Sequence, residues 1–263
     1  MPYRIDFVHP PDDALEQLIR LGALDVESVA GGIASLMPDS VEPETVANAL
    51  ATRIMSVSPA RARDDGSVWI LSPRRFRVGR LTVAPAEAAP ESNTLRLCDG
   101  LAFGTGLHPT TALCLEALES IVEISRPAQV LDIGTGSGVL ALAALMQGIE
   151  QATGLDIDAD ALRVASKNAN INGLASRLHL VQGSAGAVSG AWPLVLANIL
   201  AAPLIEMAPL VVRRVAHDGR LVLSGIPSSV AADVEHTYHR GGMRRLSADT
   251  RAGWTTLTFA PLW

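Results

Sequence analysis

From residue 95 onward, short runs of hydrophobic positions alternate with longer stretches in which apolar and polar positions are mixed. Short runs rich in Val, Leu and Ile are typical of strands buried on both faces, and the longer stretches predict covering helices. The predicted strands are AQVLDIG (128–134), QATGLDI (151–157), RLHLVQG (177–183), WPLVLAN (192–198) and GRLVLSG (219–225). The predicted helices are 109–124, 137–148, 159–172, 201–215 and 227–240. This alternation predicts an α/β domain built on a mostly parallel sheet.

The two ends of the chain depart from this alternation. Near the carboxyl end, strand-like stretches at 243–248 and 254–260 flank turn residues, which predicts an antiparallel hairpin. Residues 58–93 are rich in Pro, Ala and Arg, a composition typical of linkers. Before them, the pattern predicts strands at 3–8 and 26–38 and helices at 13–23 and 42–54. We therefore expect a small α+β domain at 1–60, a linker at 61–94 and the main domain at 95–263.

Composition narrows the class of protein. A chain of 263 residues that is 48% hydrophobic can bury a large core, yet no apolar run approaches the ~20 residues that span a bilayer. Cys98 and Cys114 form no CxxC pattern, so neither a zinc site nor a disulfide framework is expected. The net charge of −6 disfavours sequence-independent phosphate binding, and the acidic amino terminus is unlike a secretory leader. These features predict a cytoplasmic protein with no metal, no membrane partner and no direct sequence-specific nucleic-acid binding.

The segment VLDIGTGSG, at 130–138, predicts a ligand-binding turn between a strand and a helix. Its glycines follow GxGxG, whereas a dinucleotide fingerprint would need glycine where Val139 stands, which disfavours a nicotinamide-dependent oxidoreductase. Asp156 ends the next predicted strand, where a carboxylate can accept hydrogen bonds from both hydroxyls of a ribose. Together these features predict a nucleoside ligand. The simpler alternative is that the glycines only turn a tight corner and Asp156 only caps the following helix.

This order of elements resembles that of the class I S-adenosylmethionine-dependent methyltransferases, whose Rossmann-like seven-stranded sheet ends in an antiparallel hairpin. Two further segments, AFGTGLHPTTALCLEAL (102–118) and ANILAAPLIEMAPLV (197–211), resemble signature segments of the PrmA-type ribosomal protein methyltransferases, as does PRRFRVGRL (73–81). The resemblance implies S-adenosyl-L-methionine as cofactor. It also implies N-methylation of lysine ε-amines and/or the N-terminal α-amine of large-subunit ribosomal protein eleven, a protein partner that the amino-terminal unit would recognise.

The resemblance also assigns site residues. The residues expected to bind the cofactor are Phe103, Thr105, Thr111, Gly134, Gly136, Asp156 and Asn198. The resemblance places Thr111 and Asn198 there, whereas Phe103 could wall the site or belong to the core. The first Gly-Thr-Gly loop, 104–106, would cover the cofactor that the second loop, 134–136, cradles. Thr111 lies in a first helical turn, where a hydroxyl and unpaired backbone amides suit a carboxylate, although a plain capping role is the alternative.

Asn198 is our catalytic candidate. Methyltransferases that act on nucleobases or glutamine side chains carry a Pro-Pro-aromatic segment after this asparagine, whereas here Ile199, Leu200 and Ala201 follow it. Without an aromatic side chain to stack on a planar group, an aliphatic amine is the expected acceptor, and Asn198 could orient it by a hydrogen bond. The alternative is that Asn198 only caps the next helix. Direct displacement needs alignment and a neutral amine, but no covalent nucleophile or metal.

The sequence leaves two alternatives for the role of Asp132 and further alternatives for the function of the chain. Asp132 precedes the glycine loop and is expected either to face the cofactor's cationic end or to support residues that do. The amino-terminal unit and linker are shorter than in the family, which permits a lysine methyltransferase acting on a metabolic flavoprotein. A binding module that holds the nucleoside without turnover, for ribosome assembly, is the alternative from another class.

Overall fold

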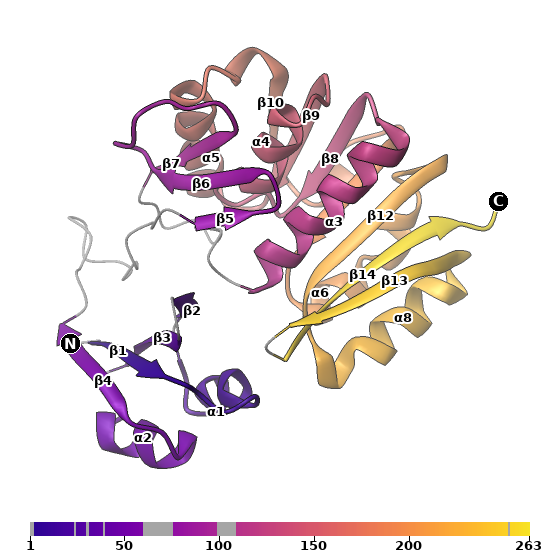
Figure 1. Ribbon diagram of the computed structural model, residues 1–263. Coiled ribbons are helices and arrows are strands. Elements are labelled where there is room, and N and C mark those ends of the chain that lie inside the picture. Colours follow the sequence, from indigo (N-terminus) through magenta and orange to yellow (C-terminus); the bar gives the residue numbers. More distant parts are fainter. Residues whose placement is uncertain are drawn as a thin grey trace.

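The computed structural model describes residues 3–23, 25–29, 32–38, 40–59, 76–98, 109–251 and 253–263. These residues form three sheets, of seven, four and three strands (Figure 1). No helix within the described residues is both long and apolar enough to cross a membrane. Phe103 and Thr105, expected near the cofactor, lie outside the described residues, as does the first Gly-Thr-Gly loop.

The seven-stranded sheet has the order β10-β9-β8-β11-β12-β14-β13. Its strands are β8 (Gln129–Ile133), β9 (Gln151–Asp156), β10 (Leu178–Gln182), β11 (Trp192–Asn198), β12 (Val215–Pro227), β13 (Met243–Arg251) and β14 (Trp254–Pro261). The first five strands in this order are parallel to their neighbours, whereas β14 is antiparallel to both β12 and β13. The chain leaves β8 toward β9 and later returns to its other side as β11. In open α/β sheets, ligands bind beyond the carboxyl ends of the strands at such a point.

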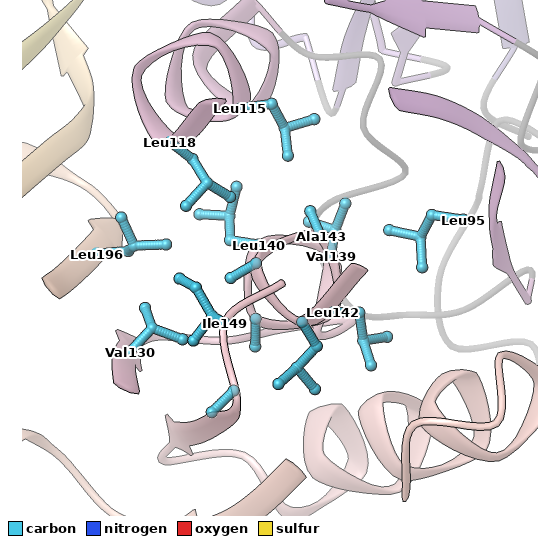
Figure 2. Packing of buried hydrophobic residues seen from close by; sticks show 14 of the residues in the cluster. Leu95, Leu115, Leu118, Val130, Val139, Leu140, Leu142, Ala143, Ile149 and Leu196 are labelled. Atoms are coloured by element: carbon cyan, nitrogen blue, oxygen red, sulfur yellow. The ribbon is translucent and has the colours of Figure 1, made fainter. Parts of the chain in front are cut away.

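Helices cover both faces of this sheet, so the α/β class predicted from the sequence is confirmed. They are α3 (Pro109–Ser125), α4 (Val139–Met146), α5 (Ala159–Ile171), α6 (Ala201–Glu206), α7 (Ala208–Val212) and α8 (Ala231–Arg240), with single 3₁₀ turns at 175–177, 185–187 and 228–230. Leu118 and Leu140, from α3 and α4, pack against Val130 and Leu196 of the sheet (Figure 2). The next residue along β8, Leu131, is buried in the core of the opposite face. This alternation explains why the strands are continuously apolar.

The predicted single helix over 201–215 is wrong. The structure divides it into α6 and α7 at Met207, because Pro209 falls at the start of α7. A proline inside one continuous helix would remove a backbone N–H donor and clash with the preceding turn. At the start of a new helix that N–H has no intrahelical partner, so the proline is tolerated there.

Residues 3–59 form an antiparallel sheet of order β2-β3-β1-β4 with two helices. The elements are β1 (Tyr3–Val8), α1 (Ala14–Arg20), β2 (Asp25–Val29), β3 (Gly32–Met37), α2 (Pro43–Leu50) and β4 (Ile54–Pro59). The single strand predicted over 26–38 is therefore wrong, since β2 and β3 pair with each other. The helix predicted over 42–54 ends at Leu50, where Ala51 adopts a left-handed conformation with φ of 47°.

The third sheet lies in the stretch predicted as a linker. It contains β5 (Phe76–Val78), β6 (Leu81–Pro85) and β7 (Thr94–Leu97), in the order β5-β6-β7. Val83 and Leu95 are fully buried in the same core cluster as α3 and α4. This sheet is therefore packed onto the large domain, although its Pro- and Ala-rich sequence resembles a free connection.

Candidate active site

A pocket of about 540 Å³ lies beyond the carboxyl ends of β8, β9 and β11. Its walls include Gly134 and Gly136 of the glycine loop, Asp156 after β9 and Asn198 after β11. The structure thus brings four of the residues expected at the site to one cavity. The cavity occupies the position where the order of the strands reverses, as expected for a ligand site in this class of fold.

The glycine loop owes its shape to backbone conformations that favour glycine. Gly134, Gly136 and Gly138 have φ values of 73°, 55° and 81°, all in the left-handed region. A Cβ atom on Gly134 would lie 2.3 Å from Cγ2 of Ile199, so this position also lacks room for any side chain. Leu155 of β9 anchors the loop, because its carbonyl accepts hydrogen bonds from the amides of Gly134 and Thr135, both at 2.8 Å.

Asp132 lies within the protein core, next to this loop. Its Oδ2 accepts hydrogen bonds from Thr135 Oγ1 at 2.7 Å and from the Ala141 amide at 3.2 Å. Burial raises the pKa of the Asp132 carboxyl to about 6; the two hydrogen bonds oppose this rise, and the charge of Asp156 adds to it. The side chain is 1% exposed and is not part of the pocket wall. Of the two roles expected for Asp132, this position fits support of the loop.

Asp156 joins the loop to the pocket. Its Oδ2 accepts a hydrogen bond from the Gly136 amide at 2.9 Å, and its Oδ1 accepts one from the Asp158 amide at 3.0 Å. The residue that caps α5 is Asp158, whose side chain accepts a hydrogen bond from the Asp160 amide. Asp156 is therefore not the helix cap. Since a carboxylate can accept about four hydrogen bonds, both of its oxygens keep acceptor capacity.

Asn198 lies at the pocket wall at the end of β11. Its Nδ2 donates a hydrogen bond to Thr111 Oγ1 at 3.3 Å, and its buried Oδ1 has no partner among the described residues. The cap of α6 is Leu200, so Asn198 does not cap that helix. Thr111 is fully buried, and its neighbour Thr110 lines the pocket instead. The structure therefore places Thr111 behind Asn198, where its hydroxyl fixes the orientation of the amide.

Sequence reasoning missed the apolar part of the pocket. Ile199, Leu200 and Met207 line it, as does Trp254 at the start of β14. Trp254 also belongs to the apolar cluster of the amino-terminal sheet, together with residues such as Phe7. The hairpin was predicted from its turn residues, but no local sequence pattern connects a hairpin tip to a pocket formed by distant strands.

Comparisons with known proteins agree with this geometry. The family described as Ribosomal protein L11 methyltransferase (PrmA) matches residues 43–261. The ribosomal protein L11 methyltransferase of Geobacter sulfurreducens is 42% identical over 209 residues, which cover 78% of this chain and 68% of that protein. Its counterpart from Chromohalobacter salexigens is 43% identical over 201 residues, covering 74% and 66%. The chain thus aligns with about two thirds of the length of these relatives.

A solved structure gives the same result. The crystal structure of a ribosomal protein L11 methylase from Lactobacillus delbrueckii subsp. bulgaricus superimposes with a TM-score of 0.65 at 28% sequence identity. The match covers 71% of this chain and 98% of that chain. These relatives favour neither the flavoprotein-specific enzyme nor the non-catalytic binding module. The chain is a methyltransferase and belongs to the ribosomal protein L11 methyltransferase (PrmA) family.

Proposed function

We propose that the pocket binds S-adenosyl-L-methionine and that the chain uses it to methylate amines of ribosomal protein L11. The observation that carries the proposal is that one pocket brings together Asp156, paired with the Gly136 amide, and Asn198, whose buried Oδ1 has no partner among the described residues. Asp156 offers acceptors for the hydroxyls of a ribose. Asn198 offers an acceptor for an N–H group of the amine that receives the methyl group.

The residues present fit this cofactor. Asp156 keeps acceptor capacity on both oxygens for the two ribose hydroxyls, and Gly134 and Gly136 of the glycine loop line the same pocket. The cofactor role of Phe103, Thr105 and Thr111 remains part of the proposal, with Thr111 acting through Asn198. When bound, the cofactor supplies an electrophilic methyl group, which the amine nitrogen accepts while the carbon–sulfur bond breaks and its electron pair stays on sulfur.

Asn198 positions the amine for this transfer. Its Oδ1 accepts a hydrogen bond from one N–H of the acceptor, which directs the nitrogen lone pair toward the methyl group. Thr111 holds the amide in this orientation by accepting from Nδ2. The proton that the nitrogen carries after transfer is lost to solvent, so no residue of the pocket has to act as a strong base.

The apolar walls select the form of the acceptor. Ile199, Leu200, Met207 and Trp254 provide no charge to stabilise an ammonium group, so an acceptor held against this apolar wall, away from the carboxylates of Asp156 and Asp158, is favoured as the neutral amine. An N-terminal α-amine, with a pKa near 7.7–8.0, reaches that form more easily than a lysine ε-amine near 10.4. We propose both as acceptors, with the α-amine reacting faster near neutral pH. A ribosomal protein substrate also implies that the enzyme works in the cytoplasm on protein, without reading nucleic-acid sequence.

Residues 1–60 are proposed to recognise the protein substrate, residues 61–94 to connect, and residues 95–263 to hold the cofactor. What supports this division is that the amino-terminal sheet has its own core, joined by Trp254 at the edge of the pocket. A substrate held on the amino-terminal unit would thus lie next to the pocket wall. Within the range proposed to connect, Val78 and Val83 belong to a core cluster of the large domain.

The test is a methylation assay with labelled S-adenosyl-L-methionine and the separated ribosomal proteins. We expect label in one small protein, with mass spectrometry locating it on lysines or the amino terminus. Lys167 is the only lysine in the sequence of 263 residues, so it is the only ε-amine of these residues at which self-labelling could occur. Label found only in nucleic acid, or in a flavoprotein from the same lysate, would overturn the proposal.

A further inference from the structure

Asn168 of α5 and Asn172, the residue that caps the carboxyl end of α5, bond the backbone at the edge of β7 and at Cys98, the residue that follows this strand. Asn172 pairs with the backbone of Arg96: its Nδ2 donates to the Arg96 carbonyl at 2.7 Å, and its Oδ1 accepts from the Arg96 amide at 2.9 Å. One helical turn earlier, Asn168 Oδ1 accepts from the Cys98 amide at 2.8 Å. The side chains of α5 thus satisfy backbone groups that the three-stranded sheet leaves open at its edge.

The spacing of the two asparagines matches the strand. Arg96 and Cys98 are two residues apart, about 6.7 Å along an extended chain. Asn168 and Asn172 are four residues apart, about 6 Å along a helix and on the same face. The i, i+4 pair at the carboxyl end of α5 therefore matches the i, i+2 positions at the end of β7.

Asn168 makes one further bond that Asn172 does not make. Its Nδ2 donates to the Ser137 carbonyl at 2.9 Å, and Ser137 lies within the glycine loop. The side chain of Asn168 is fully buried, and its one amide group bonds both the Cys98 amide and the Ser137 carbonyl. The approach is close because Gly138 lies against α5, where a Cβ on Gly138 would be 3.2 Å from that of Ala165.

We infer that Asn168 is a positioning residue for the cofactor: its buried amide fixes the glycine loop to β7, so that cofactor binding and docking of β7 strengthen each other. The inference rests on the proposed function, because it takes the pocket to be the cofactor site. Its physical basis is linkage: whatever orders the Ser137 carbonyl also orders Asn168, and through it the Cys98 amide. By the same reciprocity, a docked β7 presents the loop in its binding shape.

The link joins the cofactor loop to a strand that lies near the segment between the two proposed domains along the chain. β7 is the last strand before residue 99, and its sheet follows the segment that joins the two proposed domains. Asp156 fixes the loop at the Gly136 amide from the pocket side, and Asn168 fixes it at Ser137 from the side of α5. The cofactor loop is thus held at two successive residues, and only the second connection extends to β7.

The experiment uses the full chain and S-adenosylhomocysteine as the probe, with Asn168→Leu as the test variant and Asn172→Leu as its matched control. Both variants replace an asparagine by an apolar residue of similar size. Asn172→Leu removes the pairing with Arg96 and leaves the connection from Ser137 through Asn168 to Cys98 in place, whereas Asn168→Leu breaks that connection. We expect Asn168→Leu to weaken binding of the probe about tenfold, because a buried carbonyl and a buried amide lose their partner. The affinity of Asn172→Leu for the probe should stay within about twofold of the wild-type value, because this change should act almost independently of the cofactor loop. Rates at saturating cofactor should change little in either variant.

Hydrogen exchange of residues 94–98 gives a readout that a purely structural role would leave unchanged. In the wild type and in Asn172→Leu, the probe should slow exchange at the Cys98 amide; in Asn168→Leu this slowing should vanish while the glycine loop is still protected. The wild-type comparison alone tests the link even if a variant does not fold. Wild-type binding with no slowing at Cys98, or equal affinity losses in both variants, would overturn the inference. A wild-type chain that does not bind the probe would instead contradict the proposed function.

Discussion

At the scale of single residues, Asp156 and Asn198 should separate cofactor binding from alignment of the amine. Asp156→Ala removes the ribose acceptor and the partner of the Gly136 amide, so cofactor affinity should fall about ten- to a hundredfold, with a smaller effect on the saturated rate. Asn198→Ala should mainly lower the saturated rate, because alignment is expressed in the transition state. Isothermal titration and initial rates measure the two effects.

The ratio of rate loss to affinity loss decides the assignment. Thr111→Val is a useful companion, since it keeps the size of the side chain but removes the acceptor that orients the Asn198 amide. It should reduce the saturated rate in the same direction as Asn198→Ala and by less. If Asn198→Ala weakens cofactor binding as much as Asp156→Ala and leaves the saturated rate intact, Asn198 is a cofactor ligand only.

Asp132 should make stability depend on pH in a way opposite to most carboxylates. Burial raises the pKa of its carboxyl in the folded protein to about 6, above the value near 3.9 expected in the unfolded chain. Between these values the folded state binds more protons, so this group's stabilisation is complete below about pH 4 and is lost as pH rises through about 6. Because an asparagine side chain does not ionise, Asp132→Asn should remove this loss of stability as pH rises through about 6.

Urea unfolding of the wild type and Asp132→Asn over pH 4–8 tests this. Other titrating groups are common to both proteins, so they largely cancel in the difference between the two free energies of unfolding. The free energy of unfolding of the variant, relative to that of the wild type, should rise by up to about 1.4 kcal/mol per pH unit between about pH 4 and pH 6, and should level off above that range. A difference that is constant with pH would show that the Asp132 carboxyl does not titrate in this range.

At the scale of elements, the glycine loop is where sequence and structure agree most closely. Gly134→Ala forces a Cβ into Ile199 at a φ of 73°, so we expect lost stability and loss of cofactor binding. Gly173→Ala is the matched control: its φ is 68°, but nothing lies within 4 Å of the added Cβ. Both pay a backbone cost of about 1–2 kcal/mol, and only the first should abolish binding. Thermal unfolding and titration with S-adenosylhomocysteine would distinguish them, and equal binding by both variants would contradict the packing argument.

The sequence predicts well those elements whose local pattern is compatible with only one local structure. Residues 194–197 of β11 are all apolar because both faces of the strand are buried there, and the GxGxG spacing specifies a turn that only glycine adopts easily. Pro209 was a readable signal for the break between α6 and α7 that the hydrophobic pattern obscured. By contrast, the packing of β6, the pairing of Asn168 with β7 and the position of Trp254 depend on contacts between distant segments. No local pattern encodes such contacts.

At the scale of the whole molecule, charge is distributed unevenly between the proposed domains. Residues 1–60 contain three arginines and nine acidic residues, so the net charge of −6 resides entirely in this part, and residues 61–263 are neutral overall. An acidic unit suits a basic ribosomal protein, because complementary charge raises the rate of encounter and is screened by salt. The KM for the protein substrate should therefore rise with ionic strength more than the affinity for cofactor falls.

A chain that begins near residue 61 should keep cofactor binding and lose methylation of the intact protein substrate. Among the residues that the structure describes, the two core clusters of the large domain contain none before Val78, and the amino-terminal cluster contains only Trp254 from beyond residue 60. Because Trp254 would lose its apolar neighbours, a change at the pocket wall has to be separated from loss of recognition. A short peptide with a free α-amine does this, since both chains should methylate it slowly and at similar rates. Equal methylation of intact ribosomal protein L11 by the two chains would refute the division between recognition and catalysis.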